Sequence, residues 1–460
     1  MPPFIAAILF TLGILTLFVQ ERKLSGRASW ALWLPMMWLL ISGSRHVSEW
    51  LNGTSTMSQE QYLEGSPLDA AVYALLLGAA IIVLISRHQV VAKVLRKNWP
   101  IILFVIYCAI SILWSDFPGV ALKRWIKSLG DYAMILILLT EHNREAAIKQ
   151  VLSRVAIILM PLSILFVKYY PSLGRVYAEH WVGTQYFVGV SDNKNMLGMD
   201  CMIFGFAAYC QILEAWRGSR RNRNTALFVY GVVAISAIWL LILSNSMTSL
   251  SCFFVTSGLV AILSLVKAAR SPVVFNTLVA IVVVSLFSVL FLGVGSEILQ
   301  SLGRNSTLTG RTDIWPVLLS VPINPVVGTG FESFWLGSRL AYVWSFQIVN
   351  GITEAHNGYL EMYLNLGWIG VAFLAALLWS GYRNIQRMIG RDFDAGRLRV
   401  GYFVIAVVYN FTEAGFRSTD LVWIAFILAI AAPGMRIGKA VVKSKVEDAA
   451  TVDYHPAFTA

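Results

Sequence analysis

The chain has 460 residues, of which 57% are hydrophobic and only 13% are charged. This composition is too apolar for an average soluble domain, so it excludes most soluble enzymes and indicates a chain that lies mainly in lipid. The formal net charge of +11 fits cytoplasmic loops rich in Lys and Arg better than nucleic-acid binding, because such loops are usual in membrane proteins.

Apolar stretches of about 17–22 residues recur along the chain, which is the length a helix needs to cross a hydrocarbon core of about 30 Å. They begin near Pro3, Ala28, Pro67, Trp99, Val120, Val151, Asn195, Thr225, Ser249, Pro272, Gly358, Leu398 and Asp420. We therefore predict an all-α, polytopic integral membrane protein with about 12–13 transmembrane helices. The first stretch has no basic residue before it and no small-residue cleavage site after it, which indicates a retained helix and not a signal peptide.

The basic residues are distributed unevenly between successive loops. The loops after odd-numbered stretches, together with the tail, hold 25 of the 36 Lys and Arg residues, which predicts a cytoplasmic side for them and an N-terminus that faces out. The others lie on the outer side, and these are Arg45, Lys123, Arg124, Lys127, Lys168, Arg175, Lys194, Arg304, Arg311, Arg339 and Arg417. Since a basic residue at mid-helix costs roughly 2.5–3.5 kcal/mol on insertion scales, we expect those at outer helix ends to serve an anionic partner.

The predicted organisation has four parts. Residues 1–292 form the first ten transmembrane helices and include a basic segment near 115–128. Residues 293–357 form a long periplasmic loop between the tenth and eleventh helices, residues 358–437 form the last three helices, and residues 438–460 form a disordered cytoplasmic tail. The long loop contains Trp315, Trp335 and other aromatic residues, so we expect it to fold against the membrane surface, where the rings either bind sugars or form an interfacial belt.

A histidine stands at the end of the long loop, where the eleventh helix begins. One face of this helix is predicted to carry His356, Leu360, Tyr363, Gly367 and Gly370. We predict that the two glycines let another helix approach closely below the histidine. Among the histidines that the topology places outside, which are His46, His180 and His356, His356 is the candidate base or orienting group for catalysis, and the alternative is a purely structural residue.

Three cations occupy the segment that follows the fourth apolar stretch. Lys123, Arg124 and Lys127 lie within about one helical turn of each other at the outer membrane boundary. Such a group suits a lipid pyrophosphate, because charge-assisted hydrogen bonds to phosphate are strong. The alternative is contact with ordinary lipid headgroups. Lys194 and Arg417 lie at other outer helix ends and are further candidates for the same anion.

Other chemistries lack their sequence motifs. The chain has no P-loop, no HExxH, no GxSxG and no Asp-rich metal motif, which argues against an ATPase, a zincin, a serine hydrolase and a metal-dependent transferase. Cys108, Cys201, Cys210 and Cys252 all fall within apolar stretches, so we predict packing residues and neither disulfides nor zinc. No metal and no cofactor are expected.

These residues resemble the O-antigen ligase/polymerase superfamily of bacterial envelope glycosyltransferases over most of the chain, and its ExoQ-type exopolysaccharide polymerases in particular. The signature is His-Asn, nine residues and Gly-x-x-Gly, met by His356, Asn357, Gly367 and Gly370. It follows a loop with the segments from Leu308 to Trp315 and from Gly328 to Phe331. Two features depart from the family: Met247 stands where many relatives have a basic residue, and thirteen stretches exceed the usual twelve helices of the ligases.

The resemblance implies a GT-C-like fold and transfer of a glycan from an undecaprenyl pyrophosphate donor to an acceptor hydroxyl, without metal, on the periplasmic side of the bacterial inner membrane. It implies catalytic roles for His356, Arg311 and Glu361, donor pyrophosphate binding by Lys123, Arg124, Lys127, Lys194 and Arg417, and acceptor or sugar binding by Asn357, Glu332, Trp315, Trp335 and Glu413. The expected partners are lipid-linked oligosaccharide, a polysaccharide or lipid A core acceptor, and membrane lipids.

Two alternatives stay open. A polymerase and an O-antigen ligase use the same donor and differ in the acceptor. The sequence does not indicate which acceptor is used. A polysaccharide or secondary transporter would share the composition, but it should show internal repeats and helices broken at mid-membrane. We see no such repeat in the sequence, so the enzyme is favoured.

Overall fold

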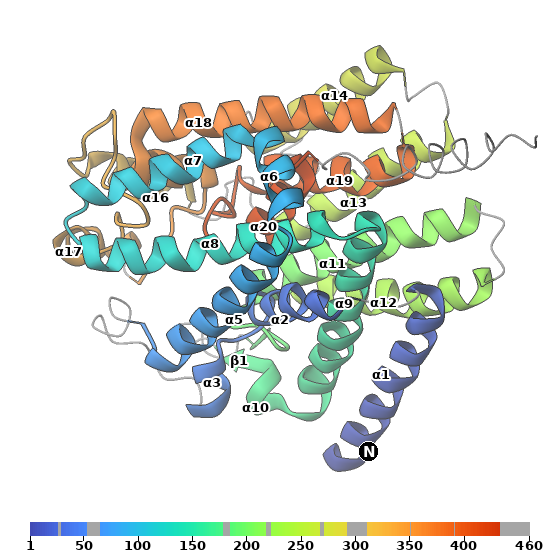
Figure 1. Ribbon diagram of the computed structural model, residues 1–460. Coiled ribbons are helices and arrows are strands. Elements are labelled where there is room, and N and C mark those ends of the chain that lie inside the picture. Colours follow the sequence, from blue (N-terminus) through green and yellow to red (C-terminus); the bar gives the residue numbers. More distant parts are fainter. Residues whose placement is uncertain are drawn as a thin grey trace, which may run out of the picture.

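The protein is almost entirely helical (Figure 1). The computed structural model describes residues 1–25, 29–52, 65–177, 185–217, 222–266, 271–291, 311–349, 351–390 and 392–432. The α-helices are α1 (Pro3–Ser25), α2 (Trp33–Ser42), α3 (Val47–Asn52), α5 (Pro67–Ser86), α6 (His88–Lys97), α7 (Trp99–Ile110), α8 (Pro118–Thr140), α9 (Arg144–Tyr169), α10 (Pro171–Gly174), α11 (Lys194–Arg217), α12 (Arg223–Leu243), α13 (Met247–Leu265), α14 (Pro272–Phe291), α16 (Arg311–Ser320), α17 (Gly337–Trp344), α18 (Gly358–Ile389), α19 (Phe393–Tyr409) and α20 (Leu421–Ile430). Three 3₁₀ turns, η1 (Trp30–Leu32), η2 (Ser111–Trp114) and η4 (Gln347–Val349), and one antiparallel pair of strands, β1 (Arg175–Tyr177) and β2 (Gln185–Phe187), complete the described elements.

The all-α, polytopic class predicted from the sequence is confirmed. Within the described residues, seven helices are long and apolar enough to cross a membrane. Taken together, α6 and the following segment of α7 and η2 are also long and apolar enough, but the two parts are bent by 90° to each other. The basic residues of α6 therefore lie on a helix next to this bend. Each of the thirteen predicted stretches contains a helix, and the number that span the bilayer stays a prediction.

Helix α11 forms the centre of the bundle. It packs against α9, α12, α13, α19 and α20. In an apolar 18-residue stretch of α11, 83% is buried, whereas only 11% is buried in the corresponding stretch of α1. Apolar residues cover both helices, because lipid and protein interior favour the same side chains. Burial therefore distinguishes a helix that faces lipid from one that organises the core.

The described part of the long loop forms a separate cap. Its core comprises Ile314, Leu318, Val321, Phe334, Trp335, Leu340, Val343, Val349, Ala355 and Leu364. The cap is fastened to the start of α8 by an ion pair between Arg339 and Asp116, and to η2 by Trp114 Nε1, which donates to Val327 O at 3.2 Å. In Figure 1 the segments α16 and α17 lie at one end of the bundle. The expected segment from Gly293 to Gly310 lies outside the described residues.

Helix α18 is broken at Gly367, and this corrects the predicted role of the glycines. Gly367 has φ 63° and ψ −165°, and a Cβ there would lie 2.3 Å from Val326 O. The cap chain runs beside the break: Thr329 N donates to Leu364 O at 3.2 Å and Trp368 N donates to Pro325 O at 2.9 Å. The close neighbour is thus a loop backbone and not another helix, because the opened helix must pair its free backbone groups with protein.

Two arginines that the topology counts among the cytoplasmic loop charges lie within a helix in the structure. Helix α18 continues to Ile389 and α19 already begins at Phe393, so Arg397 and Arg399 lie within a helix and are each 2% exposed. Arg399 donates to Leu428 O at 2.8 Å and Ala431 O at 2.7 Å at the end of α20. A count of loop charges cannot detect such pairs, because the partners are distant in sequence.

Candidate functional site

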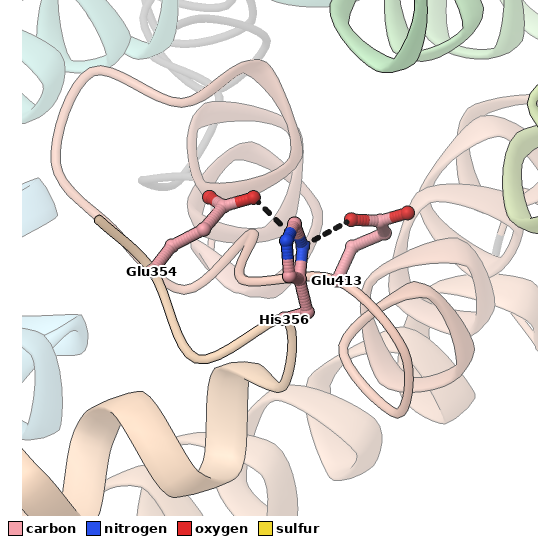
Figure 2. A group of neighbouring side chains, drawn as sticks. All are labelled: Glu354, His356 and Glu413. Carbon is pink, nitrogen blue, oxygen red and sulfur yellow. Dashed lines mark hydrogen bonds and ion pairs between the residues drawn. The ribbon is translucent and has the colours of Figure 1, made fainter. Parts of the chain in front are cut away.

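A histidine between two carboxylates forms the centre of the candidate site (Figure 2). His356 Nδ1 lies 2.9 Å from Glu354 Oε1 and 3.2 Å from Glu413 Oε2. Glu354 and His356 belong to the segment that leads into α18, whereas Glu413 comes from the segment between α19 and α20. The cluster therefore joins the end of the cap to the last loop of the bundle.

Arg417 completes the charge balance of this cluster. Its Nη1 lies 3.2 Å from Glu354 Oε2, so one guanidinium and one imidazolium face two carboxylates. The ligand atoms of Glu354, His356 and Glu413 lie within 4.8 Å of one another, a spacing that a divalent cation could also use. The described cluster already contains two cations for its two carboxylates, which lowers its need for a metal charge.

The two carboxylates also determine the charge of His356. Burial lowers the pKa of the ring, but the hydrogen bonds and negative charges of Glu354 and Glu413 outweigh it and raise the pKa to about 9. At neutral pH the imidazole is therefore mostly protonated. This state makes it a hydrogen-bond donor and a positive charge, and only a small fraction of the rings can act as a base.

Left-handed backbone conformations gather around the same place. Among the described non-glycine residues, φ is positive at Asn245, Glu332, His356 and Thr419. Of these, His356 is the centre of the cluster, and Glu332 and Thr419 line the same cavity as its carboxylates. Each such residue costs about 1–3 kcal/mol and persists only where neighbours hold it. Asp131 holds Thr419 by accepting from its N–H at 2.8 Å, and Glu332 accepts from Ser418 N at 3.2 Å.

Beside the cluster lies a cavity of about 250 Å³, roughly large enough for one sugar ring. Its walls come from the segments after α2, before α11, within the cap and between α19 and α20. The lining side chains are Ile41, Ser42, Ser44, His46, Tyr73, Asp192, Asn193, Asn195, Met196, Met199, Glu332, Glu354, Tyr409, Glu413, Ala414, Arg417, Ser418, Thr419 and Asp420. Hydroxyls, amides and carboxylates of this kind are the groups that bind sugar hydroxyls.

Three predicted site residues line this cavity, namely Glu332, Glu413 and Arg417, and His356 contacts two of the lining carboxylates. Asn357 instead caps α18, because its Oδ1 accepts from Tyr359 N at 3.0 Å and Leu360 N at 2.9 Å. The predicted residues thus separate into those that border the cavity and those that shape the chain around it.

Glu361 and Trp335 lie inside the cap. Glu361 is 2% exposed and Trp335 is 3% exposed, and Trp335 Nε1 donates to Glu361 Oε1 at 2.7 Å. Glu361 Oε2 also accepts from Ala355 N at 3.0 Å, next to His356. Trp315 Nε1 donates to Ala355 O at 3.0 Å. The sugar-contact role expected for Trp335 does not fit its burial, and these side chains hold the histidine segment in place.

Two of the predicted donor cations, Arg124 and Lys127, contact residues that line the cavity. Arg124 donates to Glu332 O, and Lys127 Nζ lies 4.3 Å from the ring centre of Tyr73. Lys123 is exposed on α8. Lys194 is the first residue of α11, and its Nζ lies 4.7 Å from the ring centre of Tyr186 in β2. Arg311 opens α16, but its side chain lies outside the described part of the chain.

Several neighbours were missed from the sequence. Glu354 stands two residues before His356, and an acidic residue beside a candidate histidine could have been tested as its partner. His46 was noted as an outer histidine but was not assigned to the site. Asp131 and Asp192 carry no local signal, because their importance comes from contacts with segments far away in the chain.

Comparisons with known proteins agree with this architecture. The sequence profile of the O-antigen ligase family matches residues 232–375, a stretch that contains the cap, His356 and the broken helix. Together with two similar proteins, this match supports a place for the chain in the O-antigen ligase/polymerase family. It is 26% identical over 327 residues to the exopolysaccharide production protein ExoQ of Rhizobium meliloti, with 68% of this chain and 71% of the relative covered. It is 23% identical over 350 residues to a Rickettsia felis protein named "Putative polysaccharide ligase", with coverage of 72% and 79%.

Together with the apolar helices, these similarities support a multi-pass membrane protein of the polysaccharide ligase and polymerase type and a glycosyltransferase-type enzyme. His356, Asn357, Glu332 and Glu361 fall within the stretch that the family profile matches. The segments with Lys123 and Glu413 lie outside that stretch. The cavity thus joins the family stretch to other parts of the chain.

Proposed function

We propose that this protein transfers a glycan from an undecaprenyl pyrophosphate donor to an acceptor hydroxyl, without a metal ion, and polymerises exopolysaccharide repeat units. In this reaction the bond between the sugar and the pyrophosphate breaks, and a new glycosidic bond forms to the acceptor oxygen. The pyrophosphate leaves with the electron pair, and the acceptor hydroxyl loses its proton. The site must therefore stabilise a developing anion and receive a proton.

The observation that carries the proposal is the group of His356, Glu354, Glu413 and Arg417 beside the cavity. Its two cations can stabilise negative charge on the leaving pyrophosphate, because cations held in advance need no reorganisation during the reaction. Its carboxylates hold these cations in place. The polar lining of the cavity supports a sugar substrate, and the charge balance of the group supports catalysis without a metal.

The donor pyrophosphate is proposed to lie against Lys123, Arg124 and Lys127 on α8. Arg124 contacts the backbone of Glu332, a lining residue, so this basic edge is directly connected to the cavity. A lipid donor would place its headgroup at the edge and its sugar in the cavity. Lys194 at the start of α11 is a further candidate for the same headgroup.

Purified protein provides the direct test. It should release undecaprenyl pyrophosphate from a lipid-linked oligosaccharide and extend the glycan, at the same rate in the presence of a chelator such as EDTA. No release, or release that requires an added divalent cation, would contradict the corresponding part of the proposal.

The periplasmic side of the site can be tested by cysteine labelling. Ser338 in the cap and Gly390 after α18 are exposed, and Cys108, Cys201, Cys210 and Cys252 are all buried, so the background should be low. In intact cells, Ser338→Cys should react with a membrane-impermeant reagent and Gly390→Cys should not. The reverse pattern would place the cavity in the cytoplasm.

An O-antigen ligase is the second candidate, because one relative carries the name of a polysaccharide ligase. The two activities differ in the acceptor. A ligase should transfer the glycan when a lipid A core acceptor is supplied, whereas a polymerase should need a second lipid-linked glycan. A transporter is disfavoured on a structural argument. The break in α18 pairs its backbone with the cap, so it is filled by protein and does not line a transport pathway.

A further inference from the structure

The cavity has a second wall, and the proposed function assigns no role to the residues that line it. This wall is formed by the segment after α2, which carries His46, by Tyr73 of α5, by Asp192 and Asn193 before α11, and by Asn195 in its first turn. Four histidines fall in the described part of the chain, and His46 is the one among them that lines the cavity directly. His88 and His142 are exposed at the ends of other helices.

The segment that carries His46 is held firmly. The neighbouring Arg45 is 5% exposed, its N–H donates to Val190 O at 3.1 Å, and its guanidinium donates to Leu173 O at 2.5 Å. On the other side, Ser48 N donates to Asp69 Oδ1 of α5 at 2.9 Å. The histidine is therefore fixed from both sides, as a group that must meet a substrate atom needs to be.

The surroundings of His46 differ from those of His356. Its Nδ1 lies 3.5 Å from Tyr73 Oη, and Lys127 lies over the Tyr73 ring. Burial and the Lys127 ammonium lower the pKa of His46, and the negative charges of Glu49 and Asp69 offset this only partly. His46 is thus neutral at neutral pH, whereas His356 is protonated. Two titratable groups with pKa values moved apart in one site are the usual arrangement for an acid and a base.

We propose that His46 is the group that accepts the proton of the acceptor hydroxyl, while His356 and Arg417 stabilise the leaving pyrophosphate. This inference rests on the proposed function and divides the work between the two walls. The acceptor O–H proton moves to the ring nitrogen of His46 that keeps its lone pair, the acceptor oxygen bonds to the sugar carbon, and the pyrophosphate departs. The protonated His46 then returns its proton to water.

The test compares variants of the purified protein with undecaprenyl pyrophosphate-linked oligosaccharide as the probe. His46→Ala should lower kcat for glycan transfer by about 10²- to 10⁴-fold, the usual contribution of a general base, with little change in KM for the donor. His46→Gln should not restore the rate, since an amide cannot accept the proton. His88→Ala, at an exposed helix start, is the matched control and should keep the wild-type rate.

The pH profile gives a readout that a structural role would not affect. The wild-type rate should fall at acid pH, below the ordinary pKa of histidine, because the pKa of His46 is lowered and the base becomes protonated only there. His46→Gln should lack this limb. Wild-type activity in His46→Ala or in His46→Gln would overturn the inference. Asp192 lines the same wall, and burial together with the neighbouring Glu49 raises its pKa to about 7. Loss of the low-pH limb in Asp192→Asn and not in His46→Gln would assign the base to Asp192.

These outcomes are separable from failure of the proposed function itself. If the wild-type protein releases no undecaprenyl pyrophosphate, the proposed reaction is wrong. If it does release the product and His46→Ala does so at the same rate with an unchanged unfolding temperature, only the assignment of His46 is wrong.

Discussion

Partly buried ion pairs occur at both ends of the bundle, and the two ends differ in what surrounds the pairs. At the end away from the cap, Arg154 pairs with Glu21 at 2.9 Å and Lys149 with Glu214 at 2.5 Å, each from one helix to another. At the cap end, Glu354, His356, Glu413 and Arg417 all lie on irregular segments. The cavity of about 250 Å³ and three left-handed residues lie at the cap end.

This difference shows which feature indicates function. A buried pair between regular helices needs no substrate, because each charge satisfies the other and the backbone is relaxed. A pair on strained loops beside an open cavity exposes its charges to a ligand, and the strain must be compensated by the rest of the fold. We therefore expect changes at the cap end to affect glycan transfer and changes at the opposite end to affect stability.

The largest effect is expected for His356→Ala. It should lower the rate of glycan transfer by about 10²- to 10⁴-fold, which is the usual contribution of a general acid or base. Membrane insertion and donor binding should persist. Transfer and donor binding are measured on the purified variant, with His88→Ala as the control. His180, the other outer histidine in the predicted topology, lies outside the described residues. Near-normal polysaccharide from His356→Ala would remove this residue from the site and leave Arg311 as the next candidate.

The next effect concerns the basic edge of the cavity. Replacing Lys123 and Arg124 together by Ala should weaken donor use strongly, since each charge-assisted contact to phosphate is worth about 1.5–3 kcal/mol. The apparent KM for the lipid donor measures it. Arg22 and Lys23 are exposed at the end of α1, so their double alanine variant is a matched control. An unchanged KM would assign Lys123 and Arg124 to ordinary lipid headgroups.

A smaller effect is expected at high pH. The pKa of His356 is raised to about 9, so the imidazolium is present below that pH and is lost above it. Glycan transfer should therefore fall by about tenfold per pH unit above pH 9 if the positive charge is needed. His356→Gln, which has no such charge, should have a low rate without this limb. A rate that rises through pH 9 would instead make His356 the base.

At the opposite end, transfer should not change. Arg399 pairs with Glu145 at 3.5 Å and with carbonyl groups of α20. Arg399→Ala should lower the free energy of unfolding by about 3–5 kcal/mol, because it leaves buried partners uncompensated. The rate per folded molecule should stay normal. Unfolding temperature and specific activity are the measurements, and Arg387→Ala, which alters an exposed residue, should change neither. Loss of activity in folded Arg399→Ala protein would contradict this prediction and would show that the two ends of the bundle are functionally coupled.

Much of the site could be predicted from residue types and their order. His356 and Arg417 were identified from their positions at the outer ends of apolar stretches, and Glu332 and Glu413 were identified through the family resemblance. The structure brings them around one cavity. Asn357, Glu361 and Trp335 were also singled out, but their hydrogen bonds show that they shape the loop. A residue type indicates which chemistry is available, and only its contacts show whether that chemistry is used locally.

The sequence by itself determined the fold class and the places where helices form. The length and apolarity of each stretch are local properties, and they decide directly whether a helix is stable in lipid. The spacing of His356, Asn357, Gly367 and Gly370 also predicted the family that the comparisons support. Tertiary structure alone decided that Gly367 breaks α18 to pair with the cap, that Glu354 and Glu413 surround His356, and that His46 shares the cavity. These contacts join segments far apart in the chain, so their free energy depends on how the helices pack and has no signature in any one stretch of residues.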